Sequence, residues 1–189
     1  MQDTQPKGID EIIRMARIVE QIGLDSVWVG DSLTAKPRLE PLTTLSVLSA
    51  HTSRVRLGTA VMLAALRHPI PLAQAATTLD LISKGRLILG MGVGGAFNEI
   101  QRQEWHNVGI DPSHRARRFE ELLKIFIISV GVLTTILFLD KILFLTELII
   151  NKGVSFREVL WMMAYIAPAF LALTIPMSVL VASVVVFNQ

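Results

Sequence analysis

The stretch Arg115-Ala-Arg-Arg-Phe-Glu-Glu-Leu-Leu-Lys-Ile-Phe126 divides the chain into two parts of different character. Of the 18 Lys and Arg residues, 15 lie at or before Lys124, and so do 13 of the 16 Asp and Glu residues. The run 125–139 that follows contains no charged residue. We therefore predict two domains, residues 1–124 in water and residues 125–189 in a membrane.

Composition narrows the classes of function. The net charge of +2 is too small to indicate nucleic acid as a partner. The chain has no Cys, so disulfides and thiol nucleophiles are excluded. Trp105 and His106 have no partner residues at metal or triad spacing, so we predict no metal site and assign both to packing or the surface. The first 25 residues carry five acidic side chains and no apolar core, unlike a signal peptide.

The first part of the chain alternates amphipathic helices with short apolar strands. The apolar spacing predicts helices at 8–23, 41–51, 71–83 and from about 113 through the dividing stretch, and strands at 26–30, 55–62 and 86–92. Each helix precedes a strand, which is typical of a parallel α/β fold. Alternation alone does not choose between an open sheet and a closed barrel.

Five motifs in this part resemble the luciferase-like flavin-dependent oxidoreductase family over about residues 8–124. They are DSVWVGD at 25–31, RLGTAV at 56–61, RHP at 67–69, LDLISKGRL at 79–87 and LGMGVG at 89–94. The resemblance implies an eight-stranded βα barrel and, as cofactor, FMN or the deazaflavin coenzyme. Three or four βα units cannot close such a barrel, and residues 1–7 offer no counterpart to the family's opening strand. We predict a partial TIM barrel.

Asp31 is the candidate catalytic residue, because it follows a strand at the end where barrel enzymes carry their reactive groups. The alternative is that its carboxylate caps the segment after it. The resemblance places the family's non-prolyl cis peptide bond between Ala60 and Val61. It also assigns cofactor contacts to Asp31, Ala60, Val61, Gly92, Val93 and Gly94, the last three in a glycine-rich loop whose amides can approach a phosphate.

Three other side chains carry smaller expectations. His68 precedes Pro69 and is expected to hold a loop rather than to transfer protons. Asp80 and Arg86 are expected to form a buried ion pair between a helix and a strand. Some deazaflavin-dependent members of the family carry a catalytic glutamate at the position of Gly95, and here Glu99 lies one turn later.

The second part of the chain reads as a two-helix transmembrane hairpin. Residues 122–145 are long enough to cross the roughly 30 Å hydrocarbon core, although a buried helix of a soluble protein is the alternative. Residues 159–187 are uncharged and contain two prolines, which a membrane helix tolerates. A polar turn at 151–158 joins the two, with Ser155 as the N-cap of the second helix. More cations precede the first span than lie in the turn, which predicts a multi-pass protein of the inner (cytoplasmic) membrane with a cytoplasmic N-terminus.

The hairpin resembles the first two spans of LptF/LptG-type lipopolysaccharide-export permeases over about residues 125–187. The matching motifs are LDKI at 139–142, LTELIINKGVS at 145–155, YIAP at 165–168 and LTIPM at 173–177. The resemblance implies the lipid bilayer, an export ATPase and permease subunits as partners.

Three hypotheses about the whole chain remain open. It is a flavin- or deazaflavin-dependent luciferase-like oxidoreductase segment fused to a membrane hairpin, a permease fragment with a foreign N-terminal extension, or a join of two truncated coding segments that performs neither role. By family the chain is described first as an oxidoreductase segment, with the permease fragment as the alternative. For activity we give most weight to the join and expect the segment to be inactive alone.

Overall fold

The fold was analysed in a computed structural model that describes residues 8–152, 155, 157, 158, 160, 161 and 164. The elements in chain order are α1 (Ile9–Gln21), β1 (Ser26–Val29), α2 (Pro41–His51), β2 (Arg56–Leu63), the 3-10 helix η1 (Ala64–Leu66), α3 (Pro69–Ser83), β3 (Leu87–Gly92), α4 (Glu99–Asn107), the 3-10 helix η2 (Pro112–His114) and α5 (Arg115–Lys152). Each helix and strand predicted before the dividing stretch is confirmed. Helix α4 was not predicted.

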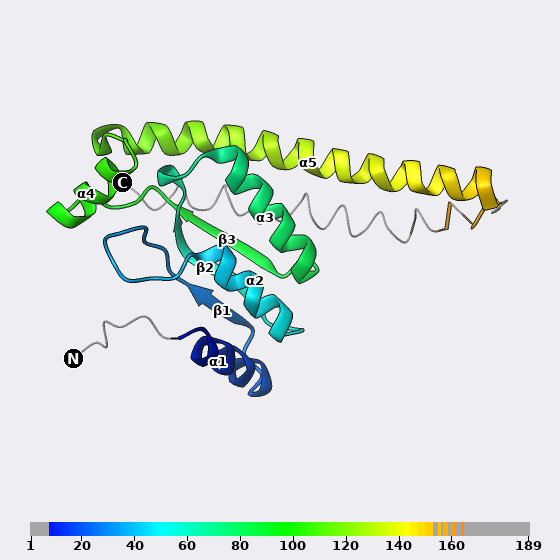
Figure 1. The fold of residues 1–189 in the computed structure, drawn as a ribbon, viewed down its shortest axis with the longest axis horizontal. Coiled ribbons are helices and arrows are strands. Elements are labelled where there is room, and N and C mark those ends of the chain that lie inside the picture. Colours follow the sequence, from blue (N-terminus) through cyan, green and yellow to red (C-terminus); the bar gives the residue numbers. More distant parts are fainter. Residues whose placement is uncertain (1–7, 153–154, 156, 159, 162–163, 165–189) are drawn as a thin grey trace.

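The three strands form one parallel sheet in the order β1-β2-β3. Val27 lies opposite Leu57, and Leu57 lies opposite Leu87. The register of β2 against β3 shifts between Thr59 and Met62. Helices α2 and α3 connect the strands, so the sheet is built from consecutive βα units (Figure 1). This is a three-stranded parallel α/β arrangement, as expected for part of a barrel.

Local sequence explains where the connecting helices begin and end. The Glu40 side chain accepts a 2.7 Å hydrogen bond from the Thr43 amide at the start of α2, where Pro41 occupies the first turn. Helix α3 ends at Ser83. Its C-cap residue Lys84 has a φ of 60°, and Gly85 follows with a φ of 77°. A left-handed pair of this kind stops a helix and turns the chain directly into β3.

The sheet has one covered face and one open face. Leu57, Met62 and Met91 point to the covered face and are buried beneath α2 and α3, together with Leu45 and Leu48 of α2. On the open face, the Trp28 side chain is 48% exposed and the Val61 side chain 44% exposed. The hydrophobic core therefore lies between the sheet and the helices, and the opposite face of the sheet is free of protein cover in the described part.

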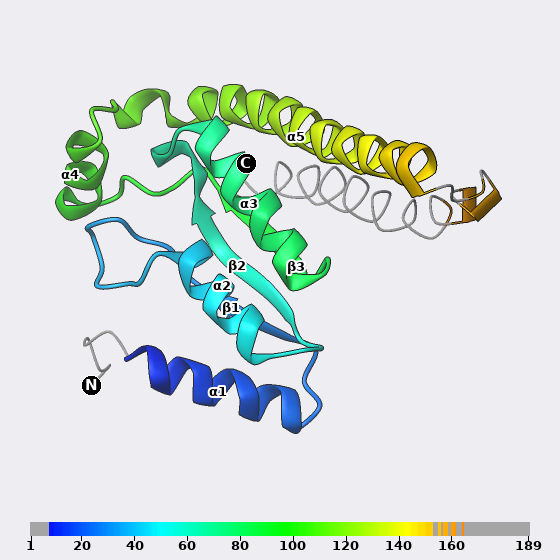
Figure 2. The ribbon, with the colours of Figure 1, turned by 45° about the vertical axis from the view of Figure 1, so that its right-hand side comes forward.

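Helix α5 is one continuous helix of 38 residues that runs along α3 and extends well beyond it (Figures 1 and 2). Its buried side chains recur at three- and four-residue steps and fall on both sides of Lys124: Phe119, Leu122, Leu123, Phe126 and Val130. The Arg118 Nε donates a 2.7 Å hydrogen bond to the carbonyl oxygen of Ala65 in η1. The packing of α5 on the folded segment thus continues past the predicted domain boundary.

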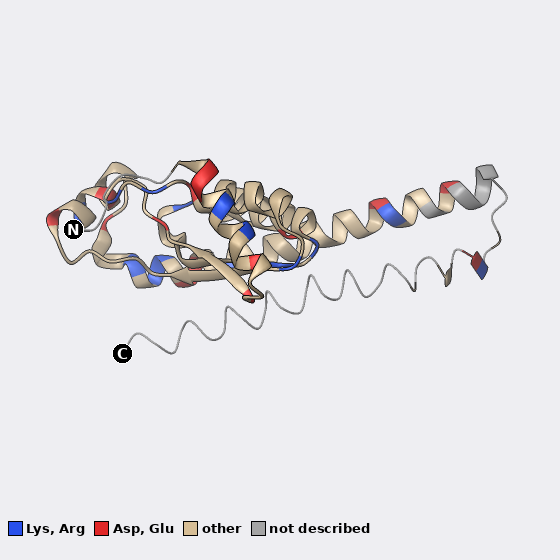
Figure 3. Ribbon diagram, turned by 90° about the horizontal axis from the view of Figure 1, so that it is seen from below, with Lys and Arg blue, Asp and Glu red and all other residues tan. Residues whose placement is uncertain are grey.

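The predicted first span is the apolar part of α5. Among the described residues, a single helical stretch, Pro112–Phe144, is long and apolar enough to cross a membrane, judged by its length and composition. Figure 3 shows the long helix leaving the folded segment through an uncharged stretch, with charged positions reappearing toward its far end. In the sequence, the charged residues after this stretch begin with Asp140 and Lys141.

The predicted second span, 159–187, lies almost entirely outside the described residues. Its predicted N-cap is confirmed. The Ser155 hydroxyl oxygen accepts from the Arg157 amide at 3.2 Å, and the Glu158 carboxylate accepts from the Ser155 amide at 3.0 Å. These hydrogen bonds are those of a serine N-cap, which satisfies amides of the first turn of a helix. A hydrogen-bonded helix start therefore lies three residues after α5 ends at Lys152.

The predicted ion pair between Asp80 and Arg86 is wrong. The Arg86 guanidinium donates to backbone carbonyl oxygens instead, at 2.7 Å to Ser83 and 3.0 Å to Val55, and to the Thr52 hydroxyl at 2.9 Å. Asp80 accepts a 3.3 Å hydrogen bond from the Leu87 amide. Burial raises the pKa of the Asp80 carboxyl. Arg86 is satisfied by the orphan carbonyl groups at a helix end, so it needs no carboxylate partner.

Candidate functional site

The candidate site lies at the carboxyl ends of the three parallel strands. β1 leads into Asp31, β2 into η1 and Arg67, and β3 into the loop 93–98. Parallel strands bring these three connections to one edge of the sheet, which is where α/β proteins place their ligands. The predicted site residues are therefore drawn from one end of the fold.

Asp31 is buried and fully engaged. Its side chain is 1% exposed, and its Oδ1 accepts from the Arg67 Nη2 at 2.9 Å while Oδ2 contacts the Arg67 Nη1. Oδ2 also accepts a 2.8 Å hydrogen bond from the Leu63 amide. A two-pronged pair of this kind fixes both partners in position. The carboxylate thus ties the end of β1 to the end of β2, and it does not cap the segment that follows it.

That segment, residues 32–36, is held by a glutamate that the sequence did not indicate. A single oxygen of Glu104, Oε1, accepts from the Ser32 hydroxyl at 2.9 Å and from the amides of Leu33, Thr34 and Ala35 at 2.6, 2.8 and 3.1 Å. Burial opposes ionisation of this carboxyl, but the hydrogen bonds outweigh burial and lower the pKa of Glu104. The Glu104 carboxylate is therefore the anchor of the β1–α2 loop.

Helix α4 positions Glu104 and ties it to the glycine-rich loop. Trp105, the next residue, is completely buried and donates a 2.9 Å hydrogen bond from Nε1 to the carbonyl oxygen of Gly95. His106 is exposed, as expected for a surface residue. The Asn98 side chain caps the start of α4 by accepting from the Gln101 amide at 2.9 Å. Helix α4 therefore joins the loops after β1 and β3.

Glycines make the open face of the sheet flat at its carboxyl end. A Cβ on Gly92 would lie 2.8 Å from the Val61 side chain, and one on Gly90 would lie 2.3 Å from the Thr59 carbonyl oxygen. Gly94 has a φ of 90°, which L side chains rarely adopt. The peptide bond between Ala60 and Val61 is cis, as predicted. The predicted cofactor residues Ala60, Val61, Gly92, Val93 and Gly94 thus lie on adjoining parts of β2, β3 and the loop after β3.

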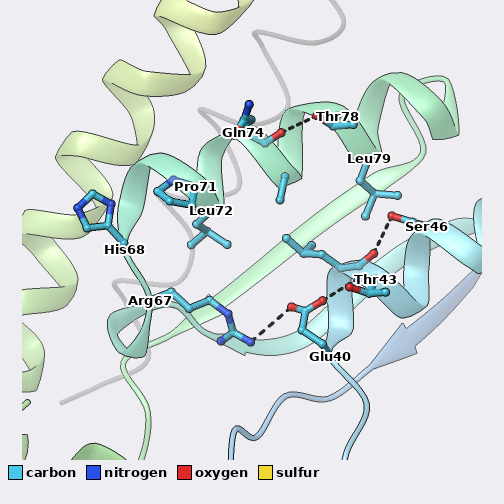
Figure 4. Close-up of a pocket in the computed structure, with 12 residues that line it drawn as sticks. Glu40, Thr43, Ser46, Arg67, His68, Pro71, Leu72, Gln74, Thr78 and Leu79 are labelled. Atoms are coloured by element: carbon cyan, nitrogen blue, oxygen red, sulfur yellow. Dashed lines mark hydrogen bonds and ion pairs between the residues drawn. The ribbon is translucent and has the colours of Figure 1, made fainter. Parts of the chain in front are cut away.

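Two other sequence candidates lie away from this surface. Glu99 is exposed and forms a 3.0 Å ion pair with Arg102. His68 is exposed at the start of α3 and lines a groove of about 610 Å³ between α2 and α3, together with Glu40, Arg67 and Leu72 (Figure 4). The helices separate this groove from the open face of the sheet. The Arg67 guanidinium lies 3.5 Å from the Glu40 carboxylate in the groove and also pairs with Asp31. Arg67 therefore connects the groove with the carboxyl ends of the strands.

A parallel sheet covered by helices on one face, with a cis peptide bond and a glycine-rich loop at its carboxyl end, defines a partial parallel α/β fold with a candidate ligand surface. The luciferase-like monooxygenase family matches residues 1–127, and the chain belongs to this family. The lipopolysaccharide export system permease LptF/LptG family matches residues 118–189. The two matches overlap in the first turns of α5.

Curated relatives agree with the first match. A flavin-dependent trigonelline monooxygenase, oxygenase component, from Acinetobacter baylyi is 32% identical over 126 residues, which cover 65% of this chain and 34% of that protein. An F420-dependent glucose-6-phosphate dehydrogenase from Amycolatopsis mediterranei is 38% identical over 107 residues, which cover 52% of this chain and 32% of that protein. The chain spans about a third of the length of the curated relatives that it matches.

Solved structures resemble the same segment. Monooxygenase RslO1 from Streptomyces bottropensis matches with a TM-score of 0.55 and 30% identity, covering 63% of this chain and 36% of that one. The oxygenating constituent of 3,6-diketocamphane monooxygenase from Pseudomonas putida, solved in complex with FMN, matches with a TM-score of 0.55 and 22% identity over 62% of this chain and 32% of its own length. The latter likeness concerns the fold alone.

Proposed function

We propose that residues 8–124 are the cofactor-binding segment of a luciferase-like oxidoreductase and hold FMN or the deazaflavin coenzyme against the open face of the sheet. The observation that carries this proposal is the surface formed by the cis Ala60–Val61 bond and Gly92, where the missing Cβ of Gly92 lets the Val61 side chain lie close to β3 and leaves a low surface for a planar ring. A bound flavin supplies the redox chemistry. The chain's own residues bind and orient it.

Each predicted site residue has a part in this arrangement. Ala60 and Val61 form the surface behind the ring, and the amides after Gly92 face the phosphate-bearing part of the cofactor. Asp31 positions β2 through Arg67 and the Leu63 amide. Because its carboxylate is occupied by these donors, Asp31 acts in this proposal by positioning the site, and proton transfer falls to another group or to water.

We further propose that the segment does not turn over alone. Within the described residues, β1 pairs only with β2, and β3 pairs only with β2. The outer edges of both strands expose backbone donors and acceptors, and the open face leaves one side of the ring in contact with water. Productive flavin chemistry needs a site that excludes water. Binding without turnover is the expected behaviour.

Titration of the purified chain with FMN and with the deazaflavin coenzyme, followed by cofactor fluorescence, tests the proposal. We expect saturable binding that Gly92→Ala weakens about tenfold, since the added methyl group displaces Val61 from the surface. Gly131→Ala is the matched control, because a Cβ at Gly131 has no heavy atom within 4 Å. Binding that does not saturate at micromolar cofactor, or equal effects of the two variants, would remove the proposal.

The match to the LptF/LptG family supports a second role for the rest of the chain. We propose that residues 125–189 form a membrane hairpin of the inner membrane with a cytoplasmic N-terminus, and that the export ATPase is its candidate partner. Failure to co-purify with that ATPase in mild detergent would count against a permease role. Sequencing the genomic locus across codons 119–126 tests the join, because two complete neighbouring genes there would identify this chain as their junction.

A further inference from the structure

Helix α5 has one uncharged stretch with two different sides. The stretch 125–139 is about 22 Å long at 1.5 Å per residue. On its inner side, Phe126 and Val130 are buried against the folded segment. On its outer side, the side chains of Ile128, Val132 and Ile136 are each more than half exposed. The inner side already has a protein partner, and the outer side has none among the described residues.

The inner contact is specific as well as apolar. Helices α3 and α5 pack against each other, and in both ribbon views α3 begins beside the first part of α5 and then slants away from it (Figures 1 and 2). Arg118 fixes the beginning of α5 to η1 through its hydrogen bond to the Ala65 carbonyl oxygen. The hydrophobic core includes α5 side chains as far as Val130, and Leu133 packs against it. About five turns of α5, from residue 115 to residue 134, thus belong to the folded segment.

Crossing a bilayer would use the same stretch of α5, residues 125–139. A span needs about 20 apolar residues, and the part of α5 beyond Thr134 carries Asp140, Lys141, Glu147 and Lys152. That part offers no uncharged length sufficient for a crossing. If the stretch 125–139 crossed the bilayer while packed on α3, the end of α3 with Asp80 and Lys84 would enter the hydrocarbon core as well. Charged side chains at that depth are strongly disfavoured.

We infer that the hydrocarbon core of a phospholipid bilayer and helix α3 compete for the same side of α5. The chain keeps α5 packed on α3 or inserts it across the membrane, and one state excludes the other. This inference rests on the membrane attachment proposed above. Insertion uncovers η1 and the α3 surface beneath α5, so the membrane-bound form of the chain exposes part of its core to water.

Single-cysteine labelling tests the competition, because the chain contains no native Cys. Ala65→Cys reports on packing, since Ala65 is completely buried where α5 meets η1. Ile128→Cys reports on lipid contact, since Ile128 is 65% exposed on the outer side. His106→Cys, on the exposed surface of α4, is the control for labelling efficiency. The full-length variants are made by cell-free synthesis with and without phosphatidylcholine vesicles and treated with a water-soluble maleimide.

Without vesicles we expect Ile128→Cys to react and Ala65→Cys to be protected. With vesicles the pattern should reverse, each labelling rate changing at least about tenfold relative to His106→Cys. Protection of both positions by vesicles would overturn the inference, because α5 would then contact lipid while still packed on η1. If Ile128→Cys stays reactive with vesicles, the proposed membrane attachment itself fails, and the inference fails with it.

Two further variants keep the test interpretable. Reactivity of Ala65→Cys without vesicles would mean that the substitution disturbs η1, in which case Leu66→Cys, buried in the same turn, replaces it. Arg118→Ala removes the hydrogen bond to Ala65 and leaves the stretch 125–139 unchanged. Competition predicts that Arg118→Ala increases the vesicle-bound fraction. An unchanged fraction would contradict the competition.

Discussion

The two halves of α5 form one continuous helix but lie in different surroundings. The first half lies on α3, and its buried side chains Phe119, Leu123 and Phe126 complete the core beneath the sheet. The second half extends beyond the folded segment, where Ile136 and Leu143 are exposed. The change from packed to exposed occurs near Thr134, whereas the change in charge pattern occurs at Lys124. Hydrophobicity along a helix therefore does not by itself tell which apolar residues belong to a core.

The largest expected change in stability comes from comparing a buried and an exposed side chain on the same turn of α5. Phe126→Ala removes a side chain that is 1% exposed and should destabilise the folded segment by about 3–5 kcal/mol. Ile128→Ala, at a position 65% exposed, should change stability by less than about 0.5 kcal/mol. Thermal unfolding of both full-length variants, followed by tryptophan fluorescence, measures the difference. Equal losses would place Phe126 outside the core.

Glu104 provides the next comparison, between a buried and an exposed carboxylate on α4. Glu104→Ala leaves the Ser32 hydroxyl and three loop amides without their acceptor and should cost about 2–3 kcal/mol. Glu99→Ala removes an exposed ion pair with Arg102 and should cost less than about 0.5 kcal/mol. Urea unfolding at neutral pH distinguishes them. A Glu104→Ala midpoint equal to that of Glu99→Ala would show that water replaces the carboxylate without loss.

The pH dependence of stability follows from the same carboxylate. Hydrogen bonds lower the pKa of Glu104 below its ordinary value of 4.5 in the folded chain. Its contribution is therefore present above about pH 4.5 and is lost as pH falls through the folded-state pKa. We expect the wild-type chain to lose more stability than Glu104→Gln when unfolding midpoints at pH 6 and pH 3 are compared. Parallel losses would assign the acid sensitivity to other groups.

The smallest expected effect concerns Asp80, whose pKa burial raises in the folded state. The charged form is disfavoured there, so Asp80 opposes folding once pH exceeds its ordinary pKa, and the penalty grows until pH reaches the raised folded-state value. Asp80→Asn keeps an oxygen that can accept from the Leu87 amide and removes the charge. We expect this variant to be about 0.5–1 kcal/mol more stable than the wild-type chain at pH 7. A destabilised variant would show that the charged form is needed.

The elements of the folded segment could be predicted because their apolar spacing and helix-end residues agree with one another. Helix α4 could not, because its sequence EIQRQEWHN contains only two large apolar residues and its stability depends on Trp105 packing in the core. Glu104 was missed for the same reason, since its donors lie about 70 residues earlier in the chain. Only the fold brings the two together.

Within the candidate site, the cis bond between Ala60 and Val61 could be predicted from family motifs, and the pairing of Asp31 with Arg67 could not. Asp31 and Arg67 each lie in a family motif, but 36 positions separate them in the chain, and either side chain could have faced solvent. Parallel packing of β1 against β2 decides that they meet. The predicted domain boundary at Lys124 marks a change in charge along the chain. Buried side chains of α5 continue past it, and Phe126 and Val130 join the hydrophobic core.

We propose that the luciferase-like segment includes the first five turns of α5 and is incomplete without them. Thermal unfolding of a chain ending at Lys124, compared with a chain ending at Thr134, tests this directly. We expect the longer chain to unfold cooperatively. The shorter chain lacks Phe126 and Val130 and should be less stable by about 3–5 kcal/mol or fail to fold. Equal stability of the two chains would show that the folded segment ends at Lys124 and would contradict the proposal.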